Sequence, residues 1–307
     1  MISDAYRAQV SLLVRTIPFV AAEACFALKG GTAINLFVRD MPRLSVDIDL
    51  TYLPVHDRAT SLAAIEAALL RVKVRIEAGI PQVRVTLART QGENALTKLV
   101  IAAPAAQIKI EVTPVLRGTV YPVAVQAVTP KVEAAFGFAE IQVVSFPDLY
   151  GGKLVAALDR QHPRDLFDVR DLLRTEGIDA ALRNAFAVYM IGHGRPMAEV
   201  LSARPKDITQ EYARGFAGMT DEAVTQADLE AARTEMVLQI VGGMPESHRR
   251  LLLSVEKGEP DWDVLGLANI ATLPAVQWRL QNIRGLSEAR RAANVAELAR
   301  VLNLPVT

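Results

Sequence analysis

Two aspartates, Asp47 and Asp49, stand one residue apart in the otherwise apolar stretch "LSVDIDLTYL". Alternate side chains of a strand share one face, and two residues along a strand span about 6.6 Å, so both carboxylates point into one region. At an effective dielectric constant of 20, their repulsion costs about 2.5 kcal/mol, which a divalent cation offsets. Carboxylate oxygens suit Mg²⁺, and paired carboxylates are typical of metal-dependent phosphoryl transfer. The alternative interpretation is an exposed strand with solvated acids.

A third carboxylate is expected from the stretch "QIKIEVTP". Its alternation turns the two isoleucines toward the core and Glu111 toward the opposite face. We expect Glu111 to complete a magnesium site with Asp47 and Asp49. Ser45 shares the face of the two aspartates, and we place it among the nucleotide-binding residues.

A glycine turn precedes this strand in the stretch "LKGGTAINLF". Gly30 and Gly31 let backbone amides approach a phosphate closely, and the helix expected after them offers its positive N-terminus. The Thr32 hydroxyl is then placed to donate to a phosphate oxygen. On its own a glycine pair is also typical of an ordinary strand-to-helix turn.

A lysine and two further acids lie in "GGKLVAALDRQHPRDLFD". Lys153 is expected to neutralise a triphosphate, with Gly151 and Gly152 clearing room beside it; a solvated helix lysine is the alternative. Asp165 and Asp168 lie three residues apart on one face of a helix. One of them is expected to orient the lysine or act on the attacking hydroxyl. Asp165 also fits the ordinary role of an acid in the first turn of a helix.

These residues need a sheet and neighbouring helices to hold them in place. Apolar periodicity predicts helices over residues 4–24 and 57–78, and a helix after the glycine turn. Alternating segments predict successive strands of one mixed sheet, over residues 25–31, 44–53, 81–90, 96–103, 107–114 and 121–128.

From Phe146 onward the strand signals nearly vanish and helices alternate with turns. We therefore predict an α+β chain of two domains. Residues 1–145 form the catalytic core with its mixed sheet, and residues 146–307 form a helical domain that completes the active-site cleft.

Composition limits the classes of function. The formal net charge is zero, so a nucleic acid partner must be held by a local basic patch. The one cysteine, Cys25, excludes an internal disulfide and a cysteine-built zinc site. The sequence has no apolar run of membrane-spanning length and no secretory leader, which predicts a cytoplasmic protein without a membrane partner.

The stretch "GGTAINL", followed about ten residues later by "RLSVDIDL", resembles the opening signature of the AbiEii/AbiGii nucleotidyltransferase toxins, which include the MenT toxins. This family is a branch of the DNA polymerase β-like superfamily. Its K-x-x-A and R-D-x-x-D segments are matched by Lys153, Ala156, Arg164, Asp165 and Asp168. In the first signature the matching positions are Gly30, Gly31 and Thr32 for the glycine motif, Asp47 and Asp49 for the paired acids, and Glu111 for the third acid.

The resemblance implies a polymerase β-like core and a Mg²⁺-dependent transfer of NMP from an NTP to an RNA acceptor. It further implies a bacterial toxin that modifies a tRNA 3′ end, inhibits translation and is neutralised by a separately encoded antitoxin. Two alternatives remain: a small-molecule nucleotidyltransferase of the antibiotic-modifying type, and an inactive binding module that keeps only the fold.

Overall fold

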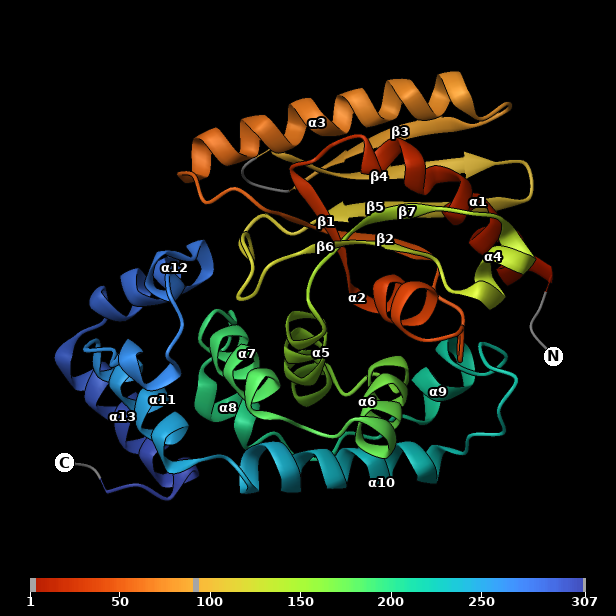
Figure 1. Cartoon of the computed structure of the whole chain (residues 1–307). Helices are drawn as coiled ribbons and strands as arrows, with labels where there is room; N and C mark the ends of the chain where they lie inside the picture. The colour runs from red at the N-terminus through yellow and green to blue at the C-terminus, as the bar shows by residue number, and fades with distance from the viewer. Residues whose placement is uncertain (1–3, 91–93, 306–307) are drawn as a thin grey trace. The chain divides into compact units, whose positions relative to one another are not determined.

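The computed structural model describes residues 4–90 and 94–305 of the chain (Figure 1). Contacts between residues divide it into two units. The first contains the chain up to Ser145 and a later segment, Phe216–Ala223. The second contains Phe146–Gly215 and the chain from Val224 onward.

The segment Phe216–Ala223 joins the first unit by hydrogen bonds next to the aspartate strand. The Leu44 amide donates to the Met219 carbonyl at 2.8 Å. The Thr220 hydroxyl donates to the Pro42 carbonyl, also at 2.8 Å. This return of the chain to the first unit was not predicted, because nothing in the local sequence pattern of 216–223 indicates a long-range contact.

The first unit is built on a mixed sheet. In the described part of the chain the sheet has seven strands in the order β3-β4-β5-β2-β1-β7-β6. The pairs β2–β5 and β1–β7 are parallel and the others are antiparallel. The bounds of the strands are β1 Phe26–Lys29, β2 Asp47–Tyr52, β3 Arg84–Arg89, β4 Leu96–Ala103, β5 Ala106–Val112, β6 Ala124–Ala127 and β7 Glu140–Val143.

Two long helices, α1 (Asp4–Ala21) and α3 (Arg58–Gly79), pack against each other and against the sheet, with α3 lying along the strands (Figure 1). In β2 the alternate residues Ile48, Leu50 and Tyr52 are buried on one side of the strand, since successive side chains point to opposite faces. The two aspartates of β2 are thereby left on the other side.

The glycine turn and the short helices after it contact β1 and β2. The helix α2 (Gly30–Thr32) runs on into a π-helical segment, η1 (Ala33–Val38), where a regular helix was expected. The helix α4 (Pro130–Phe136) and the short strand β7 were not predicted from the sequence.

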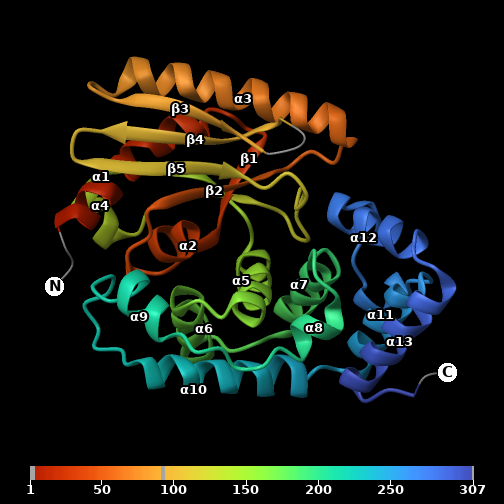
Figure 2. The same cartoon turned by 180° about the vertical axis from the view of Figure 1, so that it is seen from behind.

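The second unit is helical in its described residues, as predicted. Its longer helices pack in pairs, α5 with α7, α6 with α10, and α11 with α13 (Figure 2). The bounds of the helices are α5 Phe146–Arg160, α6 Pro163–Thr175, α7 Ala180–Ile191, α8 Met197–Leu201, α9 Thr209–Gly215, α10 Gln226–Met236, α11 Glu246–Lys257, α12 Pro274–Arg284 and α13 Glu288–Leu302, with a π-helical segment η2 Val237–Gly242 and two 3₁₀ turns, η3 Trp262–Leu265 and η4 Ile270–Thr272.

The mixed sheet followed by helices confirms the predicted fold class. In the described ranges, no helix combines the length and the hydropathy that crossing a bilayer requires.

Candidate active site

The two predicted aspartates lie on one face of β2, as the alternation required. Asp47 and Asp49 are half-exposed, while Ile48 between them is fully buried. Asp49 has a neighbour on each side: it is paired in register with Lys29 on β1 and with Glu111 on β5. The strand therefore presents two carboxylates at a central position of the sheet.

The glycine pair lies directly against this face. Gly30 has a positive φ of 73°, and a Cβ atom added there would lie 2.5 Å from the Oδ2 atom of Asp49. A Cβ on Gly31 would lie 3.0 Å from the side chains of both Arg43 and Ser45. The turn requires glycine because the backbone approaches the carboxylate strand closely, which an ordinary strand-to-helix turn does not need.

Thr32 and Ser45 join the turn to the strand from inside the protein. Thr32 is fully buried, and its hydroxyl donates to the backbone carbonyl of Asp47, with the Ser45 hydroxyl 3.0 Å away. Ser45 is itself 8% exposed. In this structure the Thr32 hydroxyl is thus used to position Asp47, and it is not presented to a phosphate as expected.

Glu111 lies next to Asp49 in the backbone register, but its carboxylate is engaged elsewhere. It forms an ion pair with Lys98, its cross-strand neighbour on β4. Among the residues that the structure describes, no three histidine, cysteine or acidic side chains converge to hold a metal ion. The Glu111 carboxylate thus pairs with Lys98 in this structure, and its part in a metal site with Asp47 and Asp49 stays a prediction.

Lys29 is a residue of this site that sequence reasoning missed. Its ammonium donates to the Thr113 hydroxyl at 2.7 Å. Burial lowers the pKa of Lys29, while the charge of Asp49 acts in the opposite direction. Its position immediately before the glycine pair is the signal in the sequence that could have identified it.

The second group of predicted residues forms a buried ion cluster in the helical unit. The Lys153 ammonium on α5 lies 2.8 Å from Oδ1 of Asp165 and 3.0 Å from Oδ2 of Asp168, both on α6. All three side chains are at most 7% exposed. This excludes the solvated helix lysine, and it shows that the two acids converge on one cation.

Arg160, which sequence reasoning missed, completes the cluster from the solvent side. Its guanidinium donates from Nε to Oδ2 of Asp165 at 2.5 Å and from Nη2 to Oδ1 at 3.0 Å. Burial by itself would raise the pKa of Asp165, but the charges and hydrogen bonds of Lys153 and Arg160 outweigh it and hold the pKa well below its usual range. The Arg160 side chain is 63% exposed, so one polar face of the cluster reaches water.

The glycine pair before Lys153 does not clear room for a ligand. A Cβ on Gly151 would lie 3.0 Å from the backbone of Ala185 and Phe186, so this glycine lets α5 and α7 pack closely. A Cβ on Gly152 would make ordinary contact with the ring of Tyr189.

The chain matches a known protein family over most of its length. A family model described as "Nucleotidyl transferase AbiEii toxin, Type IV TA system" matches residues 11–282 of the chain. The chain belongs to the AbiEii family.

AbiEii proteins are nucleotidyltransferases, and this chain is accordingly a nucleotidyltransferase of the toxin type. Its structure is similar to MenT4, a nucleotidyltransferase toxin from Mycobacterium tuberculosis H37Rv, with a TM-score of 0.56 and 16% sequence identity over 96% of this chain and 93% of that one. Among curated proteins, none matches the chain. At this identity the similarity to MenT4 establishes the fold alone.

The donor set on β2 fits a magnesium ion. Asp47 and Asp49 offer carboxylate oxygens, the ligands that Mg²⁺ prefers, on one face of β2. The backbone of the Gly30 turn lies close to this face because glycine has no side chain. Because the two carboxylates repel each other, a bound cation would stabilise them. In this AbiEii protein the two aspartates are the residues that would hold it.

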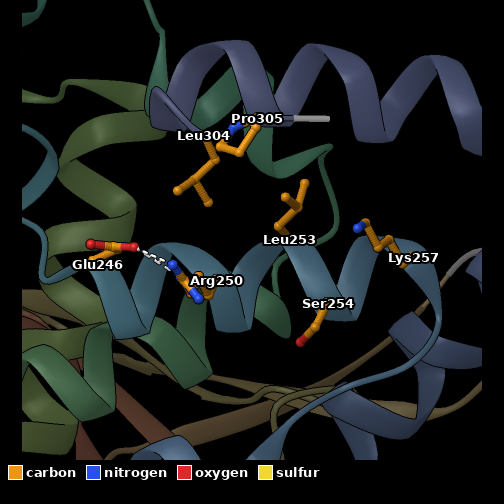
Figure 3. A pocket seen from close by; sticks show the side chains of 7 residues that line it. All are labelled: Glu246, Arg250, Leu253, Ser254, Lys257, Leu304 and Pro305. Atoms are coloured by element: carbon orange, nitrogen blue, oxygen red, sulfur yellow. Dashed lines mark hydrogen bonds and ion pairs between the residues drawn. The ribbon is translucent and has the colours of Figure 1, made fainter. Parts of the chain in front are cut away.

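A cavity of about 430 Å³ lies elsewhere in the helical unit, and none of the predicted site residues lines it. Figure 3 shows Leu253 of α11 and Leu304 of the chain after α13 projecting into it, with the Glu246–Arg250 ion pair at one side. The residues predicted for the active site are thus different from those that line this cavity.

Proposed function

We propose that this AbiEii nucleotidyltransferase transfers NMP from an NTP to an RNA acceptor, a tRNA 3′ end, with Mg²⁺ held by Asp47 and Asp49. Modification of tRNA would inhibit translation in the cytoplasm, and a separately encoded antitoxin would neutralise the enzyme. The observation that carries the proposal is the aspartate pair on β2, pressed against the Gly30 turn, in a chain of this family.

Bound Mg²⁺ would neutralise the two carboxylates and orient the phosphates of the nucleotide. The chain supplies the rest of the arrangement. Gly30 and Gly31 bring backbone close to Asp49 and Ser45, and Thr32 fixes the backbone at Asp47. We propose that phosphate oxygens bind against this rigid turn.

Lys153 is proposed to bind the triphosphate. Its ammonium is already balanced by Asp165 and Asp168, so a triphosphate has to compete with these carboxylates for it. The low pKa of Asp165 makes that carboxylate a weak base, because its negative charge is stabilised by two cations. Asp165 therefore suits an anchoring role, and we propose that Asp168 acts on the attacking hydroxyl.

The test is incubation of the purified protein with total RNA, Mg²⁺ and each α-labelled NTP in turn. Label in a tRNA-sized band, lost in Asp47→Asn, Asp49→Asn and Asp168→Asn variants, is the expected result. Arg290→Gln, an exposed arginine on α13, is the matched control and should keep full transfer. Label only on small acceptors would favour the antibiotic-modifying alternative, and transfer to no acceptor would favour the inactive binding module.

A further inference from the structure

Arg117 is a buried arginine that forms no ion pair in the described part of the chain. The residue is 6% exposed. Its guanidinium donates from Nη1 to the Asp57 carbonyl at 3.3 Å, and its buried Nε has no hydrogen-bond partner. Arginine keeps its charge at neutral pH, and a buried cation normally has an anion and a full set of acceptors. This guanidinium therefore has donor capacity that the described protein atoms do not use.

The turn that carries Arg117 is fixed to the end of β2. The Gly118 amide donates to the Tyr52 carbonyl at 2.8 Å, and the Thr51 hydroxyl donates to the Leu116 carbonyl at 3.0 Å. Gly118 has a positive φ of 75°, which suits a tight turn at a glycine. The backbone on both sides of Arg117 is thus fixed to β2 by hydrogen bonds, at Leu116 and at Gly118.

The guanidinium lies at the N-terminus of a long helix. Its acceptor, the Asp57 carbonyl, belongs to the N-cap residue of α3, a helix of 22 residues. The first amides of such a helix carry partial positive charge and attract anions. The Asp57 carboxylate serves as the cap and accepts from the Thr60 amide at 3.0 Å.

Arg58, the first residue of α3, lies close enough to Arg117 for its charge to act on the Arg117 guanidinium, and so does the Asp57 carboxylate. Burial, and after it the nearby charge of Arg58, lower the pKa of Arg117, although Asp57 acts in the opposite direction. A bound anion would stabilise the buried positive charge of Arg117.

We propose that Arg117, Arg58 and the N-terminus of α3 form a binding site for a phosphate group. The planar fork of a guanidinium matches two phosphate oxygens, and the positive end of the helix dipole favours an anion beside it. Tyr52 ends β2 three residues after Asp49, about 10 Å along a strand, so this site is distinct from the proposed magnesium site. The phosphate would come from the backbone of a nucleic acid acceptor or from a free nucleotide; only the choice of source rests on the proposed function.

The test follows the Nε–H resonance of Arg117 in ¹⁵N-labelled full-length protein during titration with inorganic phosphate. We expect a saturable shift of this resonance, which is assigned by its absence from the spectrum of Arg117→Met, with affinity about threefold weaker in Arg58→Gln. The exposed control Arg290→Gln should bind as the wild type does. Absence of a saturable shift in the wild type, up to the solubility limit of phosphate, would overturn the proposal. So would unchanged affinity in Arg58→Gln, a surface variant that does not threaten folding.

Two further titrations distinguish the sources. If the site binds the nucleic acid backbone, a short oligoribonucleotide without terminal phosphates should shift the same resonance. The salt dependence of its binding, measured by fluorescence anisotropy of the labelled oligoribonucleotide, should weaken in Arg117→Met by about one counterion. If the site binds a free nucleotide, ATP without Mg²⁺ should do so and the oligoribonucleotide should not. A resonance that responds to inorganic phosphate but to neither of these would exclude both sources and overturn the proposed role. Label transfer measured on the same variants keeps this question separate, since wild-type transfer with no phosphate response would leave the proposed function intact.

Discussion

Replacing Lys153 by methionine tests the buried ion cluster, because methionine keeps most of the side-chain volume and removes only the cation. In the wild type two cations, Lys153 and Arg160, face two anions, Asp165 and Asp168, so 2 − 2 = 0. In Lys153→Met the sum becomes 1 − 2 = −1, with the two carboxylates still buried.

The magnitude follows from the distances. At 2.8 and 3.0 Å and an effective dielectric constant of 20, each Lys153–carboxylate attraction is worth about 6 kcal/mol before desolvation. Desolvation offsets much of this, and removal of one partner from a buried pair costs about 3–5 kcal/mol in measured systems. We expect a loss near the lower end, about 3 kcal/mol, because Arg160 still binds Asp165.

Urea unfolding at pH 7, followed by circular dichroism, measures the effect. The double variant Lys153→Met/Asp168→Asn restores a charge sum of 1 − 1 = 0 and should recover at least about 1 kcal/mol of the loss. If Lys153→Met changes the free energy of unfolding by less than about 1 kcal/mol, Lys153 does not compensate the charges of the two buried carboxylates.

The remaining predictions concern the turn, the acid and the third carboxylate. Gly30→Ala should destabilise the protein by about 1–3 kcal/mol and abolish transfer, because both the positive φ of Gly30 and its close approach to Asp49 forbid a Cβ. The control Gly137→Ala, at φ 94° with no atom near the added Cβ, should show only the backbone strain. Equal losses of activity in both variants would show that the approach of Gly30 to Asp49 does not matter for transfer. The depressed pKa of Asp165 contributes stability that is fully present above the unfolded pKa of about 4 and is lost as pH falls toward the lower folded value, so unfolding measured from pH 6 to pH 3 should show a steeper loss in the wild type than in Asp165→Asn. Glu111→Gln should leave the magnesium concentration for half-maximal transfer within about threefold of the wild type, since Glu111 is paired to a lysine; a much larger increase would restore it as a metal ligand.

The aspartate strand could be predicted because its signal is local. The alternation of "SVDIDL" by itself fixes which side chains share a face, and burial of Ile48 between the two aspartates follows it. The start of α6 at Pro163 also follows from the local sequence, since the fixed φ of proline suits the first turn of a helix. The imidazole of His162 caps this helix by accepting a hydrogen bond from the Arg164 amide.

The engagement of Glu111 and Lys29 could not be predicted in the same way. Each depends on the neighbouring strand, and register between strands is set by long-range packing that one sequence does not display. The strand β7 is only four residues long, too short for a periodic pattern to distinguish it from a loop. Arg160 was overlooked because its partner Asp165 lies beyond the turn, on the next helix.

Replacement of magnesium by manganese in crystals grown with a non-hydrolysable NTP tests the central claim most directly, because the anomalous signal of manganese locates the ion. We expect a peak within about 2.2 Å of carboxylate oxygens from both Asp47 and Asp49. A peak bound by other side chains, with these two carboxylates turned away from it, would exclude the aspartate pair as the metal site.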